Sequence, residues 1–473
     1  MYNRAMKISE LIQATGAKVF GNYDKDLDVR ISTDTRTIQA GDFYLPLKGA
    51  SFDGEKFIDQ ALEKGAIGAF CTSIENFLAP ALPIKDSENN NLLLAGEGDE
   101  VENNEVQATP HPNPLLKERE LCFFLQVPDT LIAYLQLANY RRNKLNPKVV
   151  AITGSSGKTT TKEIVASTLE SKYKVFKTPL NHNNEVGLCQ TIFEMPDDTE
   201  VLVLEMGMRG LGEIELLSKY AEPDITIVSN VGTAHIGRLG SRENIAKAKC
   251  EIVKYQRGNT FIAHDDELIK NTVEFNGEKI FYSIKGVNIL EKGINYSRFE
   301  YQNNIYELNV GGDFNIENAL AAINTGGKLG LSVKEIQAGL KNYKPIEKRW
   351  EAVNTGSYEI INDSYNANPE SMRAFVDTVF ELYDNHVLIL GDMGELGENE
   401  VQYHKELGEY IFKKNPVAKV LTVGNLAKNI AEPNFMTVEE AVEYIKNNIP
   451  KESKLFLKAS RSMKFERIIE LLK

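Results

Sequence analysis

The stretch Thr153-Gly-Ser-Ser-Gly-Lys-Thr-Thr160 decides the fold of the central part of this 473-residue chain. It follows the apolar run 148–153, which is typical of a buried parallel strand, and it precedes an amphipathic stretch at 162–173. Glycines let the backbone curl so that successive N–H groups face a phosphate, and the helix N-terminus adds positive potential. The sequence therefore predicts a phosphate-binding loop at the end of a strand.

Two residues of this loop have an expected chemical role. Lys158 should reach the β- and γ-phosphates, and the Thr159 hydroxyl should bind Mg²⁺. The usual eight-residue pattern has glycine at position 152, where this chain has Ile152, so the loop is a shortened variant. A glycine-rich turn without nucleotide is the alternative, and GKTT between a strand and a helix disfavours it. The expected nucleotide contacts are Gly154, Ser155, Ser156, Gly157, Lys158, Thr159 and Thr160.

Strand and helix patterns alternate on both sides of the loop, which predicts an α/β protein of about three domains. The region after residue 345 is expected to form a doubly wound sheet. Helices are expected at 7–14 and 57–64. Strands are expected at 28–36, 41–47, 66–71, 122–127, 201–204, 225–228, 260–263, 358–361, 386–390, 419–423 and 454–457.

The segment 73–122 differs from its surroundings. It carries acidic and asparagine-rich runs and the proline cluster 109–114, so it offers little apolar surface to offset the entropy of ordering. We expect a disordered insertion there. A specific recognition loop is the alternative, because long loops are usually either functional or disordered.

The composition excludes several classes of protein. The chain has 54 basic and 67 acidic residues, a net charge of -13, which argues against nonspecific binding to nucleic acid or to an anionic membrane. The four cysteines form no CxxC pair, so neither a metal knuckle nor a disulfide framework is expected. The N-terminus does not read as a signal peptide, and no apolar run is long enough to span a membrane. We expect a soluble cytoplasmic protein.

Two polar segments follow predicted strands, where ligands bind in open parallel sheets, and a third precedes a predicted helix. Glu205 directly follows the strand 201–204 and could hold Mg²⁺ directly or through water, although a capping or turn role is the alternative. His235 ends the segment Ser229-Asn-Val-Gly-Thr-Ala-His235, where an ordinary loop histidine is the alternative. The loop 181–187 is dense in asparagine and includes Asn183 and Asn184. The ends of parallel strands share one edge, so these segments should converge.

Taken together, the motifs resemble the Mur ligase family. The resemblance covers nearly the whole chain outside 73–122. It implies a UDP-sugar-binding domain at 1–146, a central ATP-binding domain at 147–344 and a Rossmann-like domain at 345–473. The motifs, in order, are TGSSGKTT, NNEVG, LEMGM, NVGTAHIGRLGS, AKAKCEI, FNIENALAA, NDSYNANPESM, GDMGELG and KASRSM.

The resemblance implies roles for residues of the central domain. Glu205 and His235 match a second metal-binding pair. Lys249 matches a lysine that related ligases carbamylate, which would turn a cation into an anionic oxygen ligand suited to Mg²⁺. Lys247 is the nearby competitor, and a plain surface lysine is the alternative. Asn315 and Asn318 match asparagines near adenine. Lys158, Lys249 and His235 are the catalytic candidates.

The resemblance also implies roles in the two outer domains. Arg349 matches an arginine at the γ-phosphate, and Asp363 and Asn366 match residues at the ribose and adenine. Tyr365 stands where some sibling ligases have lysine, so no charge contact carries over there. The expected substrate contacts are Ser32, Thr33, Asp34, Thr35, Arg36, Lys48, Asn183, Asn184, Lys458, Ser460 and Arg461. Positive charge around 458–461 would suit a substrate carboxylate.

The implied activity is ATP-dependent amide ligation through an acyl phosphate, with Mg²⁺, in peptidoglycan precursor synthesis. UDP-N-acetylmuramoyl-tripeptide and D-alanyl-D-alanine are the implied substrates, and we expect a monomer. One alternative is another Mur-type or folylpolyglutamate synthetase-like ligase with a different acceptor. A nucleotide-binding switch is a second alternative, and it leaves the many polar loops of two domains unused.

Overall fold

The computed structural model describes residues 5–49, 52–75, 84–85, 92–93 and 122–473. The chain divides into two compact units. Unit 1 comprises Met1–Asn146 and Glu185–Pro196, and unit 2 comprises Pro147–Asn184 and Asp197–Lys473. The disorder expected for 73–122 falls mostly outside the described residues. The domain limits at 146/147 and 344/345 remain predictions.

Unit 1 is built on a five-stranded sheet of order β2-β9-β6-β5-β4. Strands β4 to β6 and β9 pair in parallel, and β2 pairs antiparallel to β9. These strands are β2 (Lys18–Phe20), β4 (Ile31–Ser32), β5 (Phe43–Tyr44), β6 (Gly68–Cys71) and β9 (Phe123–Gln126). Two short antiparallel pairs join β1 (Met6–Lys7) to β3 (Asp28–Val29) and β7 (Ile84–Lys85) to β8 (Leu92–Leu93).

The long strand expected at 28–36 is interrupted at Arg30. Before it, β3 pairs with β1, and after it β4 pairs with β5, so the chain changes sheets there. The Arg30 guanidinium binds the Asp42 carboxylate, with Nε donating to Oδ1 at 2.7 Å. Residues 33–36 form a turn, so the strand prediction was too long at its C-terminal end.

The helices of unit 1 include α6, which comes from the middle of the sequence. They are α1 (Ile8–Thr15), the 3-10 turn Gly54–Phe57, α2 (Ile58–Glu63), α4 (Thr130–Leu145) and α6 (Glu185–Glu194). Tyr134 of α4 stacks on Phe193 of α6 with ring centroids 5.4 Å apart. Arg141 donates to the carbonyls of Ile192 and Met195 at 3.1 and 2.9 Å, which suits a cation at a helix C-terminus.

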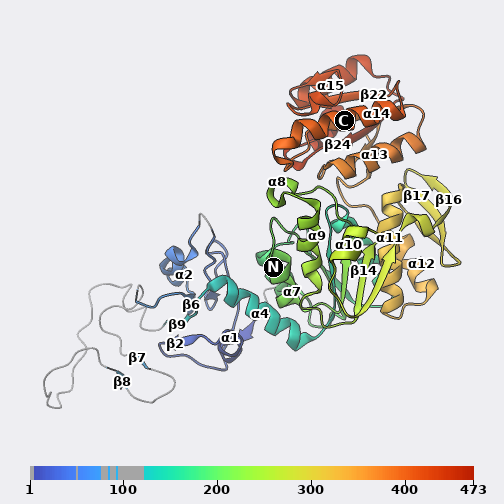
Figure 1. Ribbon diagram of the computed structural model, residues 1–473. Helices are drawn as coiled ribbons and strands as arrows, with labels where there is room; N and C mark the ends of the chain where they lie inside the picture. Colours follow the sequence, from blue (N-terminus) through green and yellow to red (C-terminus); the bar gives the residue numbers. More distant parts are fainter. Residues whose placement is uncertain (1–4, 50–51, 76–83, 86–91, 94–121) are drawn as a thin grey trace, which may run out of the picture. The chain divides into compact units, whose positions relative to one another are not determined.

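The central sheet of unit 2 is parallel throughout, with order β11-β12-β10-β13-β14-β15. Figure 1 shows β14 beside α11, which packs on it. The strands are β10 (Lys148–Thr153), β11 (Val175–Lys177), β12 (Val201–Glu205), β13 (Ile225–Val228), β14 (Thr260–His264) and β15 (Glu278–Tyr282). The helices are α5 (Lys158–Leu169), α7 (Glu213–Ala221), α8 (Ile236–Leu239), α9 (Arg242–Cys250), α10 (Glu267–Thr272), α11 (Asp313–Lys328) and α12 (Val333–Asn342). The strand predictions for this sheet are confirmed, each to within one residue.

A three-stranded antiparallel sheet follows β15 and was not predicted. It consists of β16 (Asn288–Gly293), β17 (Tyr296–Tyr301) and β18 (Asn304–Leu308). The β17–β18 turn holds Gln302 and Asn303 at φ 50° and 61°. Two residues with positive φ match the two-residue hairpin turn that suits the strand twist, so Asn303 was an available signal.

The C-terminal sheet of unit 2 has order β19-β20-β24-β21-β22-β23. Only β19 runs antiparallel, and the remaining neighbours are parallel, as a doubly wound fold requires. The strands are β19 (Glu351–Asn354), β20 (Glu359–Asn362), β21 (His386–Gly391), β22 (Lys419–Val423), β23 (Asn434–Phe435) and β24 (Lys454–Lys458). The helices are α13 (Pro369–Leu382), α14 (Glu400–Lys414), α15 (Val438–Asn448) and α16 (Glu466–Leu472).

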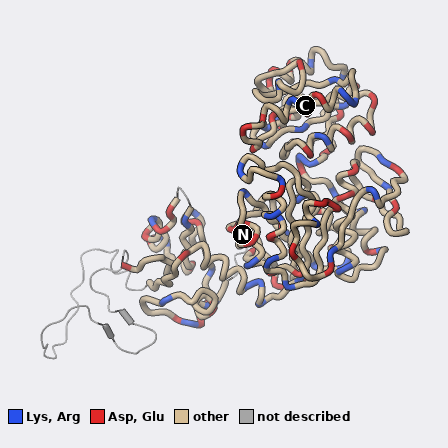
Figure 2. Tube along the Cα trace, viewed as in Figure 1, with Lys and Arg blue, Asp and Glu red and all other residues tan. Residues whose placement is uncertain are grey.

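Apolar burial holds these layers together. One core cluster joins β10 and α5 to α11 and the C-terminal strands, and Ile152, Ile316 and Phe456 in it are 0% exposed. Figure 2 shows acidic and basic residues interspersed along the described trace. Exposed ion pairs such as Lys174–Asp198 contribute little. Among the described helices, none combines the length and the apolar character that a membrane-spanning segment needs.

Candidate functional site

A cavity of about 770 Å³ opens in unit 2 at the carboxyl ends of its parallel strands. The segments that follow β10, β12 and β13 line it, together with residues of α11 and of the C-terminal domain. Its volume lies in the range of small-molecule sites, roughly 300–1,000 Å³. The predicted convergence of polar loops is therefore observed, with the phosphate loop, Glu205 and His235 all on the cavity wall.

The phosphate loop turns tightly between β10 and α5. Gly157 has φ 74°, a left-handed conformation that favours glycine, and a Cβ there would lie 2.9 Å from Asn318 Oδ1. That oxygen accepts a hydrogen bond from Thr161 Oγ1 at 2.9 Å. The first turn of α5 is thus fixed to α11, and Lys158, Thr159 and Thr160 of that turn line the cavity.

The segment after β13 holds the loop from the other side. Ser156 N donates to Asn230 Oδ1 at 2.9 Å, and Ser229 Oγ donates to Ser156 O at 2.8 Å. Gly232 N donates to Ser155 Oγ at 2.9 Å. Because these hydrogen bonds join the two segments, the conformation of the phosphate loop is preorganised for a ligand.

Lys158 points back over its own loop. Its Nζ donates to Gly154 O at 2.7 Å. Burial lowers the pKa of Lys158; the Glu205 carboxylate opposes this shift and the Arg349 charge adds to it. A phosphate would supply the negative charge that this partly desolvated ammonium lacks.

Oxygen donors that suit Mg²⁺ lie beside the loop. The Glu205 carboxylate, 5% exposed, accepts from Asn183 Nδ2 at 2.9 Å through Oε1. Among the described residues its Oε2 has no hydrogen-bond partner, and Lys162 Nζ lies 3.9 Å away. Within the described ranges no three His, Cys, Asp or Glu side chains gather as a metal cluster. One carboxylate and the Thr159 hydroxyl fit an ion that takes its other ligands from phosphate and water.

Arg349 of the C-terminal domain reaches the phosphate loop. Its Nη2 donates to Thr159 Oγ1 at 2.9 Å. The guanidinium lies over the Tyr365 ring with Cζ 4.1 Å from the centroid, a cation–π contact. The structure therefore brings Arg349 and Thr159 together, as expected for residues that share a triphosphate.

His235 contacts the GDMGELG segment rather than Glu205. Its Nδ1 lies 2.7 Å from Glu395 Oε2, and this contact lowers the pKa of Glu395. His235 itself has φ 67°. A metal role for His235 beside Glu205 remains a prediction, since both line the cavity but no contact joins them.

Lys249 lies on α9 and is 1% exposed. Burial lowers its pKa well below the usual value, and the Lys158 charge adds to this. A plain surface position is thereby excluded. Lys249 is not among the residues that line the cavity, in contrast to Lys158 and Thr159.

The two asparagines of α11 differ in position. Asn318 lines the cavity beside Gly157. Asn315 is buried, does not line it, and donates through Nδ2 to Gly311 O at 2.7 Å. Asn318 is thus available to a nucleotide, whereas Asn315 fixes the start of its helix.

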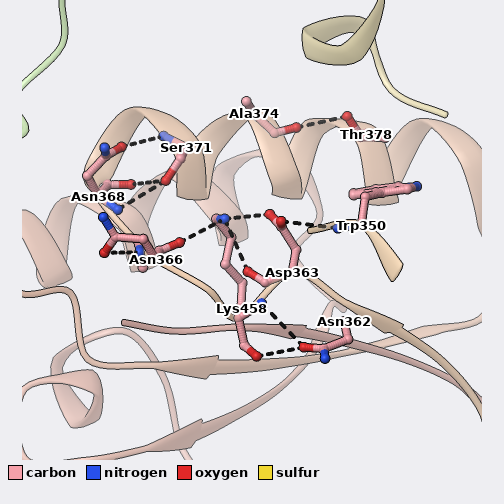
Figure 3. A network of polar contacts seen from close by, with 11 residues as sticks. Trp350, Asn362, Asp363, Asn366, Asn368, Ser371, Ala374, Thr378 and Lys458 are labelled. Atoms are coloured by element: carbon pink, nitrogen blue, oxygen red, sulfur yellow. Dashed lines mark hydrogen bonds and ion pairs between the residues drawn. The ribbon is translucent and has the colours of Figure 1, made fainter. Parts of the chain in front are cut away.

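The remaining C-terminal candidates also reach the cavity. Lys458 binds Asp363 and the carbonyl of Asn366, as Figure 3 shows. Ser460 Oγ accepts from Gly394 N at 2.9 Å, and Arg461 Nη1 lies 3.4 Å from Glu466 Oε1. All of these except Glu466 line the cavity, together with Asn183 and Asn184.

The candidates for the UDP-sugar belong to unit 1. Ser32 Oγ donates to Asp34 O at 3.2 Å, and the Asp34 carboxylate binds Arg36 Nε at 2.9 Å. Thr35 Oγ1 donates to Gln60 at 2.9 Å, and Thr33 is half-buried. Lys48 is exposed. Most of these groups are held in a hydrogen-bonded turn, so their role as substrate contacts remains a prediction.

Sequence reasoning missed six titratable residues on the cavity wall, which are Arg209, Glu213, His264, Glu317, Glu370 and Glu395. His264, the last residue of β14, lies with Nε2 3.2 Å from Glu317 Oε1, and this hydrogen bond raises the pKa of His264. Glu370 accepts from Thr233 Oγ1 at 2.9 Å. Glu395 is the partner of His235. A polar residue directly after a predicted strand, as His264 is after 260–263, was the available signal.

Three family domains match this chain. The Mur ligase middle domain matches residues 152–326, and the glutamate ligase domain of Mur ligases matches 348–461. The Mur ligase family catalytic domain matches 29–114. The matches thus cover the phosphate loop and the C-terminal cavity residues.

Curated relatives and solved structures are similar to this chain over nearly its whole length. The UDP-N-acetylmuramoyl-tripeptide--D-alanyl-D-alanine ligase of Bacillus subtilis is 33% identical over 99% of this chain and 98% of its own. A crystal structure of MurF from Acinetobacter baumannii has a TM-score of 0.81 at 27% identity, with both chains fully covered. MurF ligase from Thermotoga maritima in complex with ADP has a TM-score of 0.76 at 25% identity, covering 94% of this chain and 97% of that one. This chain belongs to the Mur ligase family.

Proposed function

We propose that this protein is an ATP-dependent ligase that joins D-alanyl-D-alanine to UDP-N-acetylmuramoyl-tripeptide in peptidoglycan precursor synthesis. One observation carries the proposal: a phosphate loop and polar residues of a second domain line one cavity. The full-length relative from Bacillus subtilis bears the name of this activity, and a similar structure holds ADP. Action in the cytoplasm and as a monomer is part of the proposal.

The chemistry requires activation of a carboxylate. The γ-phosphoryl group of ATP passes to the terminal carboxylate of the tripeptide, and ADP leaves. The amine of the dipeptide then attacks the acyl carbon, a proton is lost from nitrogen, and phosphate leaves as the amide forms. Lys158 and Arg349 lie at the phosphate loop, where they would bind the oxygens that gain charge in the first step.

Thr159 and Glu205 would hold Mg²⁺, with Lys249 and His235 as further candidates. The ion would neutralise phosphate oxygens while the phosphoryl group moves. The residues of the C-terminal domain would orient the nucleotide and exclude water from the acyl phosphate, which would otherwise hydrolyse.

The proposal is tested with purified protein, ATP, Mg²⁺, UDP-N-acetylmuramoyl-tripeptide and D-alanyl-D-alanine. We expect the pentapeptide product in the mass spectrum and phosphate release that requires all three substrates. Phosphate release that is the same without either peptide substrate would indicate a nucleotide switch. Product formed only with another amine would indicate a ligase with a different acceptor.

A further inference from the structure

Lys458 has no donor left for a substrate. It is the last residue of β24 and 3% exposed. Its ammonium donates to Asp363 Oδ2, to Asp363 O at 3.4 Å and to Asn366 O at 3.2 Å. Figure 3 shows these contacts converging on Lys458. Since a lysine ammonium has three N–H donors, the loop 363–366 uses all of them.

The loop that Lys458 fixes carries Tyr365. Asp363 Oδ1 accepts from Trp350 N at 3.2 Å, and Tyr365 N donates to Lys348 O at 3.1 Å. The loop is therefore bound on one side to Lys458 and on the other to the segment 348–350. That segment includes Arg349.

Tyr365 supports the guanidinium of Arg349. Cζ lies 4.1 Å from the ring centroid, and among the described residues Nε has no hydrogen-bond partner. The other end of the group, Nη2, donates to Thr159 Oγ1. The ring thus takes the place of a hydrogen-bond partner in fixing the direction of Arg349.

We infer that Lys458 is a positioning residue that acts through the loop 363–366 and Tyr365 to direct Arg349 at the phosphate loop, and that it is not a ligand for a substrate carboxylate. The inference rests on the proposed function for the identity of the nucleotide. It replaces the expectation that Lys458 contacts the peptide end of the site.

The experiment measures binding of a non-hydrolysable ATP analogue with Mg²⁺ by calorimetry, without either peptide substrate. The binding result can therefore be interpreted even if the protein does not catalyse the proposed ligase reaction. Lys458→Met is compared with Lys454→Met, because Lys454 lies on the same strand, pairs with Glu359 at 3.0 Å and does not line the cavity. We expect Lys458→Met to weaken analogue binding about 10- to 100-fold, the equivalent of one charge-assisted hydrogen bond. Lys454→Met should leave it unchanged.

Because Lys458→Met leaves Asp363 without its ion-pair partner, it could fail to fold. Tyr365→Leu and Tyr365→Phe provide the second test. Leucine should weaken analogue binding, and phenylalanine, which keeps the ring, should restore it. In steady-state kinetics Lys458→Met should raise KM for ATP and leave KM for both peptide substrates unchanged. Unchanged analogue binding in Lys458→Met with a raised peptide KM, or equal binding by both Tyr365 variants, would overturn the inference.

Discussion

The close approach of Gly154 to Ser229 gives a quantitative prediction for the phosphate loop. A Cβ at position 154 would lie 1.9 Å from Ser229 Oγ and 3.1 Å from Ser229 Cβ. In Gly154→Ala the serine must therefore move and lose its 2.8 Å hydrogen bond to Ser156 O. Loss of the bond costs about 1 kcal/mol, and overpacking costs about 1–3 kcal/mol more. We expect a total of about 2–4 kcal/mol, divided between folding and nucleotide binding.

The assay compares Gly154→Ala with Ser229→Gly and with the double variant. If the whole cost fell on binding, calorimetry would show about 30- to 1,000-fold weaker affinity for an ATP analogue. Denaturant unfolding measures the part that falls on stability. Ser229→Gly removes both clashing atoms, so the double variant should recover all but about 1 kcal/mol. Wild-type affinity and stability in Gly154→Ala, or no recovery in the double variant, would refute the steric argument.

Three further predictions concern charged residues. Lys158→Ala should lower turnover by about 10²- to 10³-fold or more, because it removes a cation of the phosphate loop. The circular dichroism spectrum should stay unchanged, because only one internal hydrogen bond is lost. Near-normal kinetics would contradict the assignment of the ATP site. Glu317→Gln should lower the pKa of His264 in an NMR titration, since the hydrogen bond to Glu317 raises that pKa. The stability from this pair is fully present below the unfolded histidine pKa of about 6.5 and is lost as pH rises through the folded pKa, so the wild-type advantage in unfolding free energy should shrink at alkaline pH. Burial lowers the pKa of Lys249, which favours the neutral form of the amine that reacts with carbon dioxide. Carbon-13 bicarbonate should therefore give a carbamate NMR signal that Lys249→Ala lacks, and a signal retained in that variant would exclude Lys249.

The strands and the phosphate loop could be predicted from the sequence because their signals are local. A buried parallel strand is a short apolar run, as at 148–153, and GKTT places the helix that follows it. The hairpin sheet at 288–308 was missed because its strands carry polar residues on an exposed face. One long strand was predicted at 28–36, whereas the structure has two short strands that pair in different sheets. Local periodicity does not show which sheet a strand joins.

The pairings within the site depend on residues far apart in the chain. The motif KASRSM does not reveal that the Lys458 ammonium donates its hydrogen bonds to residues 363–366. His235 and Glu395 come from two motifs separated by 160 positions, and their contact follows only from tertiary structure. Residue types thus indicated the chemistry, whereas the partners had to come from the fold.

The central claim is that the cavity activates a carboxylate by phosphorylation. UDP-N-acetylmuramoyl-tripeptide labelled with oxygen-18 in its terminal carboxylate tests this most directly, with mass analysis of the phosphate released during ligation. The account predicts one labelled oxygen in each phosphate, because that oxygen leaves the acyl carbon with phosphorus. Unlabelled phosphate accompanied by full formation of the pentapeptide would contradict it.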